Sequence, residues 1–417
     1  MRHSIDKGSS KSFDAQNTLL LLNYTVFLFV SAGIGIFVNL YLWINSLNIT
    51  AIIIYQLFGA LMVMPGFMIM LRYSSILKNV QVYRFGILIY IIFIMTIIVL
   101  QQRSGEYAWL LGVESGTAIG FFYAGYNSLT YQKVSHNTRI LFNSWRSFLS
   151  NLSGILAPLL LGSIIVVFKE HIGYLLDYLI LLAVLVYELY QSRKILGTNH
   201  LGRLKLRLSF SIPFRNVRYP PIAFADFFWS MSGVLRSIVL TVFVYVVSGS
   251  TLIVSVFWVI VAVSQTFGSF YARKHLHARL VSLSGFSNLL NLLGSIGIVL
   301  YYDDVFLILF GLIYGVSNSI LGVTYSTAAM DVIDTDPMPG ENQYHYIILR
   351  EYILLFARLS GIFVTLFVIN SVRLQLAIHS LIIVASLFAI IAWFAVSAFY
   401  KPDLVGNNEI ISMTRGT

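Results

Sequence analysis

Charged side chains stand inside long apolar segments at six positions of this chain. They are Glu114, Arg146, Asp226, Arg236, Glu351 and Arg358. A charge at the centre of a lipid bilayer costs about 2.5–3.5 kcal/mol on insertion scales, so such residues pair with one another or face a polar cavity. A guanidinium group can hold an anion, and a carboxyl group can pair with it or carry a proton. The chemistry that these residue types allow is ion pairing, anion binding and proton transfer.

Arg358 is the deepest of these charges in its segment, GENQYHYIILREYILLFARLSG (340–361). We expect a helix that enters the apolar layer near Tyr344. Arg358 then lies about 10 Å deeper than Glu351 and on the same helix face. At that depth it cannot reach water along its own side chain, whereas Arg350 at the edge can. Two interpretations stay open, an ion pair that fixes helix packing and a cation for an anionic group of a small molecule.

The other buried charges are constrained by helical geometry. Asp226 precedes Arg236 by ten residues and lies nearly opposite it on one helix, so the two are not expected to pair. A stripe of glycines at positions 112, 116 and 120 suits close helix packing. If this stripe packs against a neighbour, Glu114, about 200° around the helix from Gly116, faces a cavity. We expect Glu114 or Asp226 to carry a proton. All four acidic and basic residues Glu114, Asp226, Glu351 and Arg146 are candidates for proton coupling or for ion pairs inside the membrane.

The composition of the chain indicates that these segments lie in a membrane. The chain has 417 residues, of which 58% are hydrophobic and 11% charged, and its mean hydropathy is +0.82. A soluble domain carries about 25% charged residues. Apolar runs of about 20 residues, the length that crosses a bilayer, recur along the chain. We predict an all-α polytopic membrane protein with twelve transmembrane helices, at 18–42, 50–71, 80–100, 107–130, 140–168, 174–191, 219–247, 250–272, 280–300, 305–329, 344–369 and 375–399.

The chain divides into two similar halves. The segment 192–218 holds seven Lys and Arg residues and no acid. It separates a six-helix bundle at 1–191 from a second bundle with a tail at 219–417. GFFYAGYNS (120–128) and GLIYGVSNS (311–319) share the pattern G-x-x-Y-x-x-x-N-S, and LSGIL (152–156) matches LSGIF (359–363). Matches at corresponding places in both halves indicate a duplication.

Loop charges predict the orientation. With both termini in the cytoplasm, the tails and cytoplasmic loops hold 21 of the 27 Lys and Arg residues, and the outside loops hold Arg103, Lys169 and Arg373. The net charge of +10 is therefore a membrane-orientation signal and does not indicate nucleic-acid binding. We expect a multi-pass protein of the cell membrane.

Two six-helix halves around a basic central loop make the chain similar to the major facilitator superfamily. The loop signature of that superfamily is reduced here to GFMIMLRYSSILKN (66–79) and GSFYARKHLHAR (268–279), which keep basic residues without the aspartate. The resemblance implies two bundles that rock around a central site, which helices carrying Glu114, Asp226 and Arg236 line. For substrate binding we expect the two midplane cations Arg358 and Arg236, with Tyr314 and Asn318 of the repeated pattern. For cytoplasmic gating we expect Arg72, Lys78, Arg273, Lys274 and Arg350.

The function that follows is secondary active transport. We expect a small anionic or zwitterionic solute to move by alternating access, with proton coupling as an option and a monomer as the working unit. The alternative is a non-transporting membrane receptor or assembly factor on the same scaffold. No Walker A, H-E-x-x-H or G-x-S-x-G motif occurs, so we expect no enzyme and no cofactor. We read the acidic stretch 331–341 as a solvated loop, with a divalent metal site as the lesser alternative.

Overall fold

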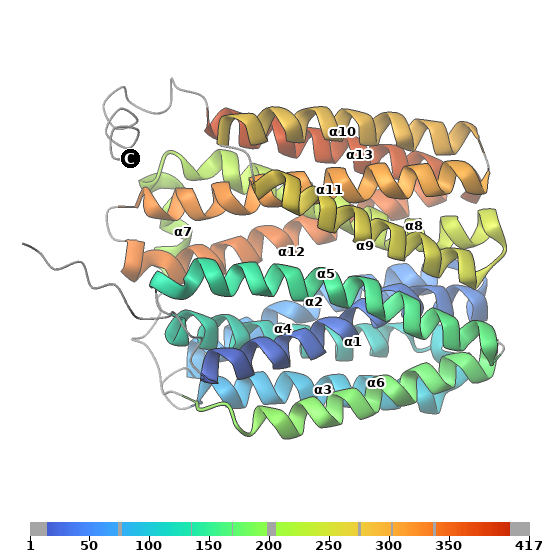
Figure 1. The fold of residues 1–417 in the computed structure, drawn as a ribbon, viewed down its shortest axis with the longest axis horizontal. Helices are drawn as coiled ribbons and strands as arrows, with labels where there is room; N and C mark the ends of the chain where they lie inside the picture. Colours follow the sequence, from blue (N-terminus) through green and yellow to red (C-terminus); the bar gives the residue numbers. More distant parts are fainter. Residues whose placement is uncertain are drawn as a thin grey trace, which may run out of the picture.

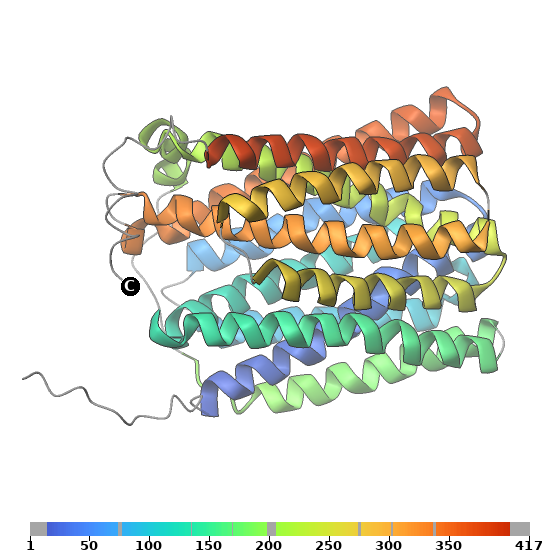
Figure 2. The same ribbon diagram turned by 45° about the horizontal axis from the view of Figure 1, so that its top comes forward.

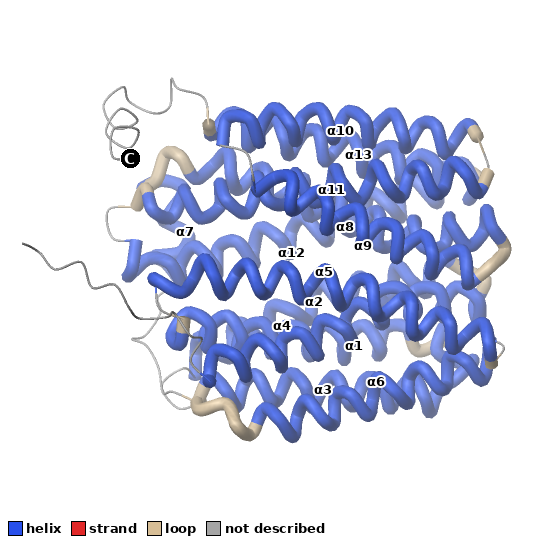
Figure 3. Tube along the Cα trace, in the orientation of Figure 1, coloured by secondary structure: helices blue, strands red, loops and turns tan. Residues whose placement is uncertain are grey.

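The computed structural model describes residues 15–73, 77–134, 136–168, 170–197, 206–273, 277–301, 303–336 and 339–400. Within these residues the chain is helical throughout and holds no strand (Figure 3). The helices are α1 (Ala15–Ser46), α2 (Ile49–Tyr73), α3 (Asn79–Leu100), a 3-10 turn η1 (Gln101–Gly105), α4 (Ala108–Lys133), α5 (His136–Val167), α6 (Glu170–Ser192), α7 (Leu206–Arg215), α8 (Tyr219–Ser248), α9 (Thr251–Arg273), α10 (His277–Leu300), α11 (Asp304–Asp334), α12 (Pro339–Ser371) and α13 (Leu374–Phe399).

Twelve long helices lie side by side, and each coincides with one predicted transmembrane segment (Figure 1). Eleven stretches of the described chain are long and apolar enough to cross a membrane. α4 is not among them, because its glycine, serine and threonine residues and Glu114 lower its hydropathy. The first residues of α1, the short helix α7 and the last residues of α13 lie at one end of the bundle, in both Figure 1 and Figure 2. We call this end the terminal face and the opposite end the far face.

Helix α7 was not expected from the sequence. It lies in the basic segment between the halves. Leucine and basic residues alternate there, so the sequence pattern does not indicate the short amphipathic helix that forms. Its Ser209 hydroxyl contacts Nδ1 of His345 on α12 at 3.0 Å. Just after it, Asn216 donates from Nδ2 to the Val332 carbonyl at 3.0 Å and to the Tyr346 hydroxyl at 2.8 Å. The segment is thereby fastened to the terminal ends of α11 and α12.

Glycines allow the closest helix contacts. Gly112, Gly116 and Gly120 on α4 lie directly against the backbone of α2, where an added Cβ would meet carbonyl oxygens. Gly315 on α11 lies in the same way against the Val261 carbonyl of α9. The pair α4–α2 therefore corresponds to the pair α11–α9, as the repeated sequence pattern indicates. The exact bundle boundaries at 191 and 219 stay a prediction.

The two sets of six helices meet through α5 with α9, α2 with α12 and α1 with α8. Asn39 on α1 donates from Nδ2 to the Ser237 carbonyl on α8 at 2.9 Å. On α5, Gly154 faces Ala262 of α9, and Gly162 faces Ser255 of the same helix. These contacts lie between the middle of the bundle and the far face.

We expect Gly116→Ala to destabilise the protein by about 1–3 kcal/mol, the usual cost of overpacking a tight interior. The added methyl group meets the backbone of Gly59, which cannot rotate away. Gly233→Ala is the matched control, because nothing lies within 4 Å of the Cβ added there. Thermal unfolding of the purified variants in detergent checks this, and equal midpoints for the two variants would contradict the packing role of the stripe.

Candidate functional site

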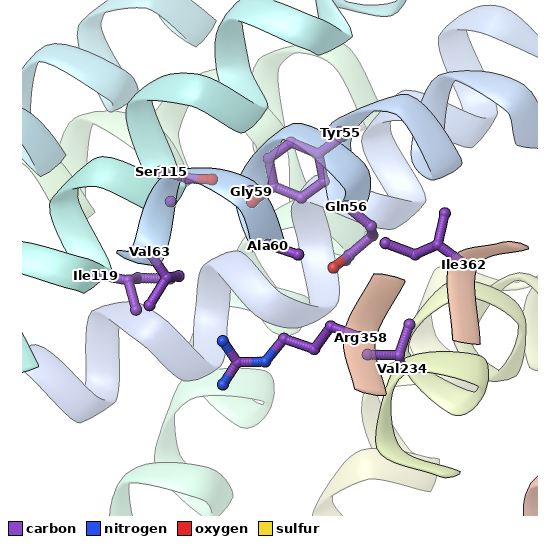
Figure 4. A pocket seen from close by; sticks show the side chains of 11 residues that line it. Tyr55, Gln56, Gly59, Ala60, Val63, Ser115, Ile119, Val234, Arg358 and Ile362 are labelled. Atoms are coloured by element: carbon purple, nitrogen blue, oxygen red, sulfur yellow. The ribbon is translucent and has the colours of Figure 1, made fainter. Parts of the chain in front are cut away.

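A cavity of about 230 Å³ lies between the two halves, near the middle of the bundle (Figure 4). Helices α2 and α4 form one wall, and α8 and α12 form the other. It is lined by Tyr55, Gln56, Gly59, Ala60, Val63, Ser115, Gly116, Ile119, Val234, Arg358 and Ile362. Among these lining residues the one charge is that of Arg358, so the cavity is electropositive.

The guanidinium group of Arg358 points into this space and away from its own helix (Figure 4). Within the described part of the chain, Arg358 forms no hydrogen bond and no ion pair. Its direction follows from its neighbours on α12. Ala357 is fully buried, and Gly361 packs against Leu235 of α8. Because Arg358 and Ile362 are displaced by one residue from that pair, they turn toward the cavity.

Polar groups near the far-face end of the cavity connect the two halves. Gln56, a lining residue on α2, donates from Nε2 to Oδ1 of Asn39 at 3.3 Å. Asn39 in turn donates to the Ser237 carbonyl across the interface. This chain of amides links α2, α1 and α8. Sequence reasoning missed Gln56, although a glutamine within the apolar run 50–71 is a visible signal.

Arg236 lies apart from Arg358, inside the second set of helices. It is 4% exposed, and its Nη2 atom donates to the Ser386 hydroxyl at 3.1 Å. Its guanidinium carbon stands 4.6 Å from the ring centre of Tyr314. Val234 lines the cavity, so Arg236, two residues further along α8, points to the other side of that helix. The structure thus separates Arg236 and Tyr314 from the cavity that we expected them to share with Arg358.

Asn318 also lies outside the set of cavity-lining residues. It stands one turn beyond Tyr314 on α11 and is half-buried. Its predicted role in substrate binding is therefore not explained by this cavity.

Asp226 and Arg350 form an ion pair between α8 and α12. The Nε atom of Arg350 donates to Oδ1 of Asp226 at 3.1 Å and to the hydroxyl of Tyr325 on α11 at 3.2 Å. The Asp226 side chain is 1% exposed, whereas that of Arg350 is 44% exposed. Glu351 is an electrostatic neighbour of this pair. The sequence placed Arg350 at a gate and Asp226 among the ion-pair candidates but did not match them.

Glu114 differs from its expected orientation. The glycine stripe beside it does pack against α2, but the cavity lies on that same side, because Gly116 lines it. Glu114 instead accepts a hydrogen bond from the Thr96 hydroxyl of α3 at 2.9 Å. Arg146 on α5 is an electrostatic neighbour of the hydroxyl groups of Tyr123 and Tyr126. Neither residue is among those that line the cavity.

The predicted gating residues are placed only in part. Lys78 precedes α3 and is exposed at the terminal face. Arg72 and Arg273 belong to the last turns of α2 and α9, but their side chains lie outside the described residues, as does all of Lys274. In the described ranges no group of three or more His, Asp or Glu residues could hold a metal ion.

Removing Arg350 is expected to destabilise the fold, because Asp226 then remains buried without its cation. We expect Arg350→Gln to cost about 1–3 kcal/mol, the range for a buried polar group left unsatisfied. Adding Asp226→Asn to Arg350→Gln is expected to recover part of that loss. Thermal unfolding of the two single variants and the double variant checks this, and additive losses would show that the two groups do not interact.

No protein-family model matches the chain. The uncharacterized protein YqgE of Bacillus subtilis (strain 168) is 24% identical over 398 residues, which cover 94% of this chain and 92% of that protein. An uncharacterized protein in the sodM 3' region of Geobacillus stearothermophilus is 27% identical over 166 residues, which cover 39% of this chain and 78% of that protein.

Solved structures with the same fold are transporters. The nucleoside transporter NupG has a TM-score of 0.65 at 12% identity, covering 93% of this chain and 100% of that chain. A POT family transporter in complex with 5-aminolevulinic acid has a TM-score of 0.66 at 15% identity, covering 92% and 96%. A bacterial homologue of the lysosomal transporter Spinster has a TM-score of 0.65 at 13% identity, covering 94% and 98%. The chain therefore has the major-facilitator-type fold that its sequence predicts.

Proposed function

We propose that this chain is a secondary transporter that carries a small anionic or zwitterionic solute across the cell membrane by alternating access. The observation that supports this most directly is the position of Arg358. Its guanidinium group lies in a cavity between the two halves, and no acid of the described chain neutralises it. The solved structures with this fold are transporters, which supports the same function.

The chemistry of the cavity favours an anion. A guanidinium group removed from bulk water recovers its lost hydration best from a carboxylate or phosphate group, which its fork of donors matches in two hydrogen bonds. Gln56, Ser115 and Tyr55 add neutral polar groups for the rest of the solute. The volume of about 230 Å³ lies below the range of about 300–1,000 Å³ that is usual for drug-sized ligands. The site therefore suits a metabolite of a few heavy atoms rather than a large drug.

Alternating access requires that the contacts between the halves break and form again. The contacts described above lie between the middle of the bundle and the far face. If both termini are cytoplasmic, as the loop charges predict, this conformation is closed toward the outside. The transport cycle then has to separate α5 from α9 and α1 from α8.

Thermal stability against a panel of carboxylates, phosphates and amino acids tests the role of Arg358. We expect one anionic class to stabilise the protein, by about 2.7 kcal/mol at a hundredfold excess over Kd. Arg358→Gln is expected to remove this stabilisation, and Arg358→Lys to keep part of it, because lysine retains the charge without the planar fork. Arg103→Gln is the control, since Arg103 is exposed and pairs only with Glu106 in the described chain. An Arg358→Gln variant that responds like the wild type would overturn the assignment.

Flux through liposomes separates the transporter from the receptor alternative. A transporter is expected to exchange the stabilising anion between the inside and the outside of the vesicles. A receptor or assembly factor on this scaffold would bind that anion without exchanging it.

Cross-linking tests alternating access, because the chain has no cysteine of its own. The Cβ atom that a side chain at position 154 would carry lies 3.6 Å from the Cβ atom of Ala262, within the usual range for a disulfide. We expect the double variant Gly154→Cys, Ala262→Cys to lose flux when oxidised and to regain it when reduced. Each single variant, oxidised in the same way, is expected to keep its flux. Full flux through the oxidised and cross-linked double variant would contradict the proposed movement of α5 against α9.

A further inference from the structure

Two acids on α6 are buried without a cation. Asp177 is 1% exposed and Glu188 is 0% exposed. Neither carboxyl oxygen of Asp177 has a hydrogen-bond partner among the described residues. Oε1 of Glu188 accepts from the Tyr83 hydroxyl of α3 at 3.0 Å, while Oε2 has no partner there. In the part of the chain that the structure describes, no lysine or arginine forms an ion pair with either acid.

The spacing of the two acids places them on one face of α6. Eleven residues correspond to about 16 Å along the helix and to about three full turns, so both side chains point the same way. That face packs against α1 and α3. Asp177 lies nearer the far face, and Glu188 lies nearer the terminal face. The sequence could show their positions, but the burial and the missing cation become visible only in the fold.

Tyrosine side chains lie near both acids. Tyr174 and Tyr178 stand beside Asp177 on α6, and Tyr41 of α1 packs against both rings, with centroids 5.0 and 5.6 Å away. Around Glu188, α3 contributes Tyr83 and also Tyr90, which is an electrostatic neighbour. Further electrostatic neighbours of these tyrosines lie on α4 (Tyr126) and α2 (Tyr55). Arg84, which follows Tyr83 in the sequence, donates to the Ser192 carbonyl at 2.8 Å and not to either acid.

Tyr55 connects this group to the cavity that contains Arg358. It is an electrostatic neighbour of both Tyr178 and Tyr90, and it also lines the cavity. At the other end, a second cavity of about 210 Å³ lies near the far face. It is lined by Tyr41, Ile97, Ile98, Gln101, Gln102, Ile172, Leu175 and Tyr178. Tyrosine side chains therefore lie near the far-face cavity, the two acids and the central cavity, but the Tyr178 hydroxyl and both oxygens of Asp177 form no hydrogen bond among the described residues.

We propose that Asp177 and Glu188 are the proton-binding sites of this transporter. An unpaired carboxylate is too costly to keep in an apolar interior, so each acid holds a proton. In one transfer, an O–H bond of the carboxyl group breaks as another forms on a neighbouring oxygen. Water in the far-face cavity returns the proton, so that charge balances over a cycle. This inference rests on the proposed function.

The two acids favoured by sequence have different contacts. Asp226 is held by Arg350, whereas Glu114, like Glu188, accepts one hydrogen bond from a hydroxyl group.

Infrared spectroscopy of the purified protein in lipid vesicles tests the proposal without any solute. At pH 7.5 we expect a carbonyl band from protonated carboxyl groups. Asp177→Asn and Glu188→Gln are each expected to remove the absorbance of one group, whereas Glu106→Gln, at an exposed ion pair, removes none. Transfer to D₂O is expected to shift the band, because a proton carrier has to exchange its proton with solvent. A band that neither variant reduces, or one that D₂O never shifts, would overturn the proposal.

Folding and transport give independent controls. Asn and Gln copy the shape of a neutral acid, so both variants are expected to keep the wild-type thermal midpoint. In vesicles, Asp177→Asn is expected to abolish uptake driven by a pH gradient but to keep exchange of the stabilising anion. Loss of exchange as well, or unchanged pH-driven uptake, would reject the coupling role. If no variant and no wild-type protein moves any anion, the proposed function fails, while the infrared result still decides whether the acids hold protons.

Discussion

The cost of a charge in an apolar interior organises this structure, and the guanidinium group of Arg358 shows it most directly. Two other buried charged side chains have partners within the chain. Asp226 has Arg350, and Arg236 has the face of Tyr314 and the Ser386 hydroxyl. Arg358 has no such partner among the described residues, and it lies where the two halves meet. In the proposed function, the counter-charge comes from a solute anion that enters the cavity.

The helices around the cavity are joined by two different kinds of contact. Within each half, glycines bring α4 against α2 and α11 against α9 so closely that backbone touches backbone. Such contacts resist movement, because nothing in them can rotate or slide without a clash. Between the halves, Gly162 leaves no room for a Cβ beside Ser255, whereas a Cβ added at Gly154 would meet Ala262 at an ordinary van der Waals distance of 3.6 Å. The two halves therefore meet through glycines and small side chains.

Sequence reasoning recovered the twelve long helices of the described chain because eleven of them are encoded in their own stretch of hydropathy and length, and α4, which is less apolar, lies between two of them. It also identified the glycine stripe and the depth of Arg358, which follow from helical spacing alone. It could not match Asp226 with Arg350, since their helices are more than a hundred residues apart and no local pattern records the pairing. It also misplaced Glu114. A helical wheel fixes the angle between two side chains, but the neighbouring helix that receives each of them is decided by packing.

The Arg358 cavity and the α6 acids meet at Tyr55, and this has a consequence for the energetics of transport. A solute anion that crosses alone carries its charge through the membrane potential, at about 2.3 kcal/mol per 100 mV. An anion that crosses together with one proton carries no net charge, so the potential neither drives nor opposes it. In the proposed transport cycle, the positive charge of Arg358 serves binding, and the acids of α6 take up and release the coupled proton.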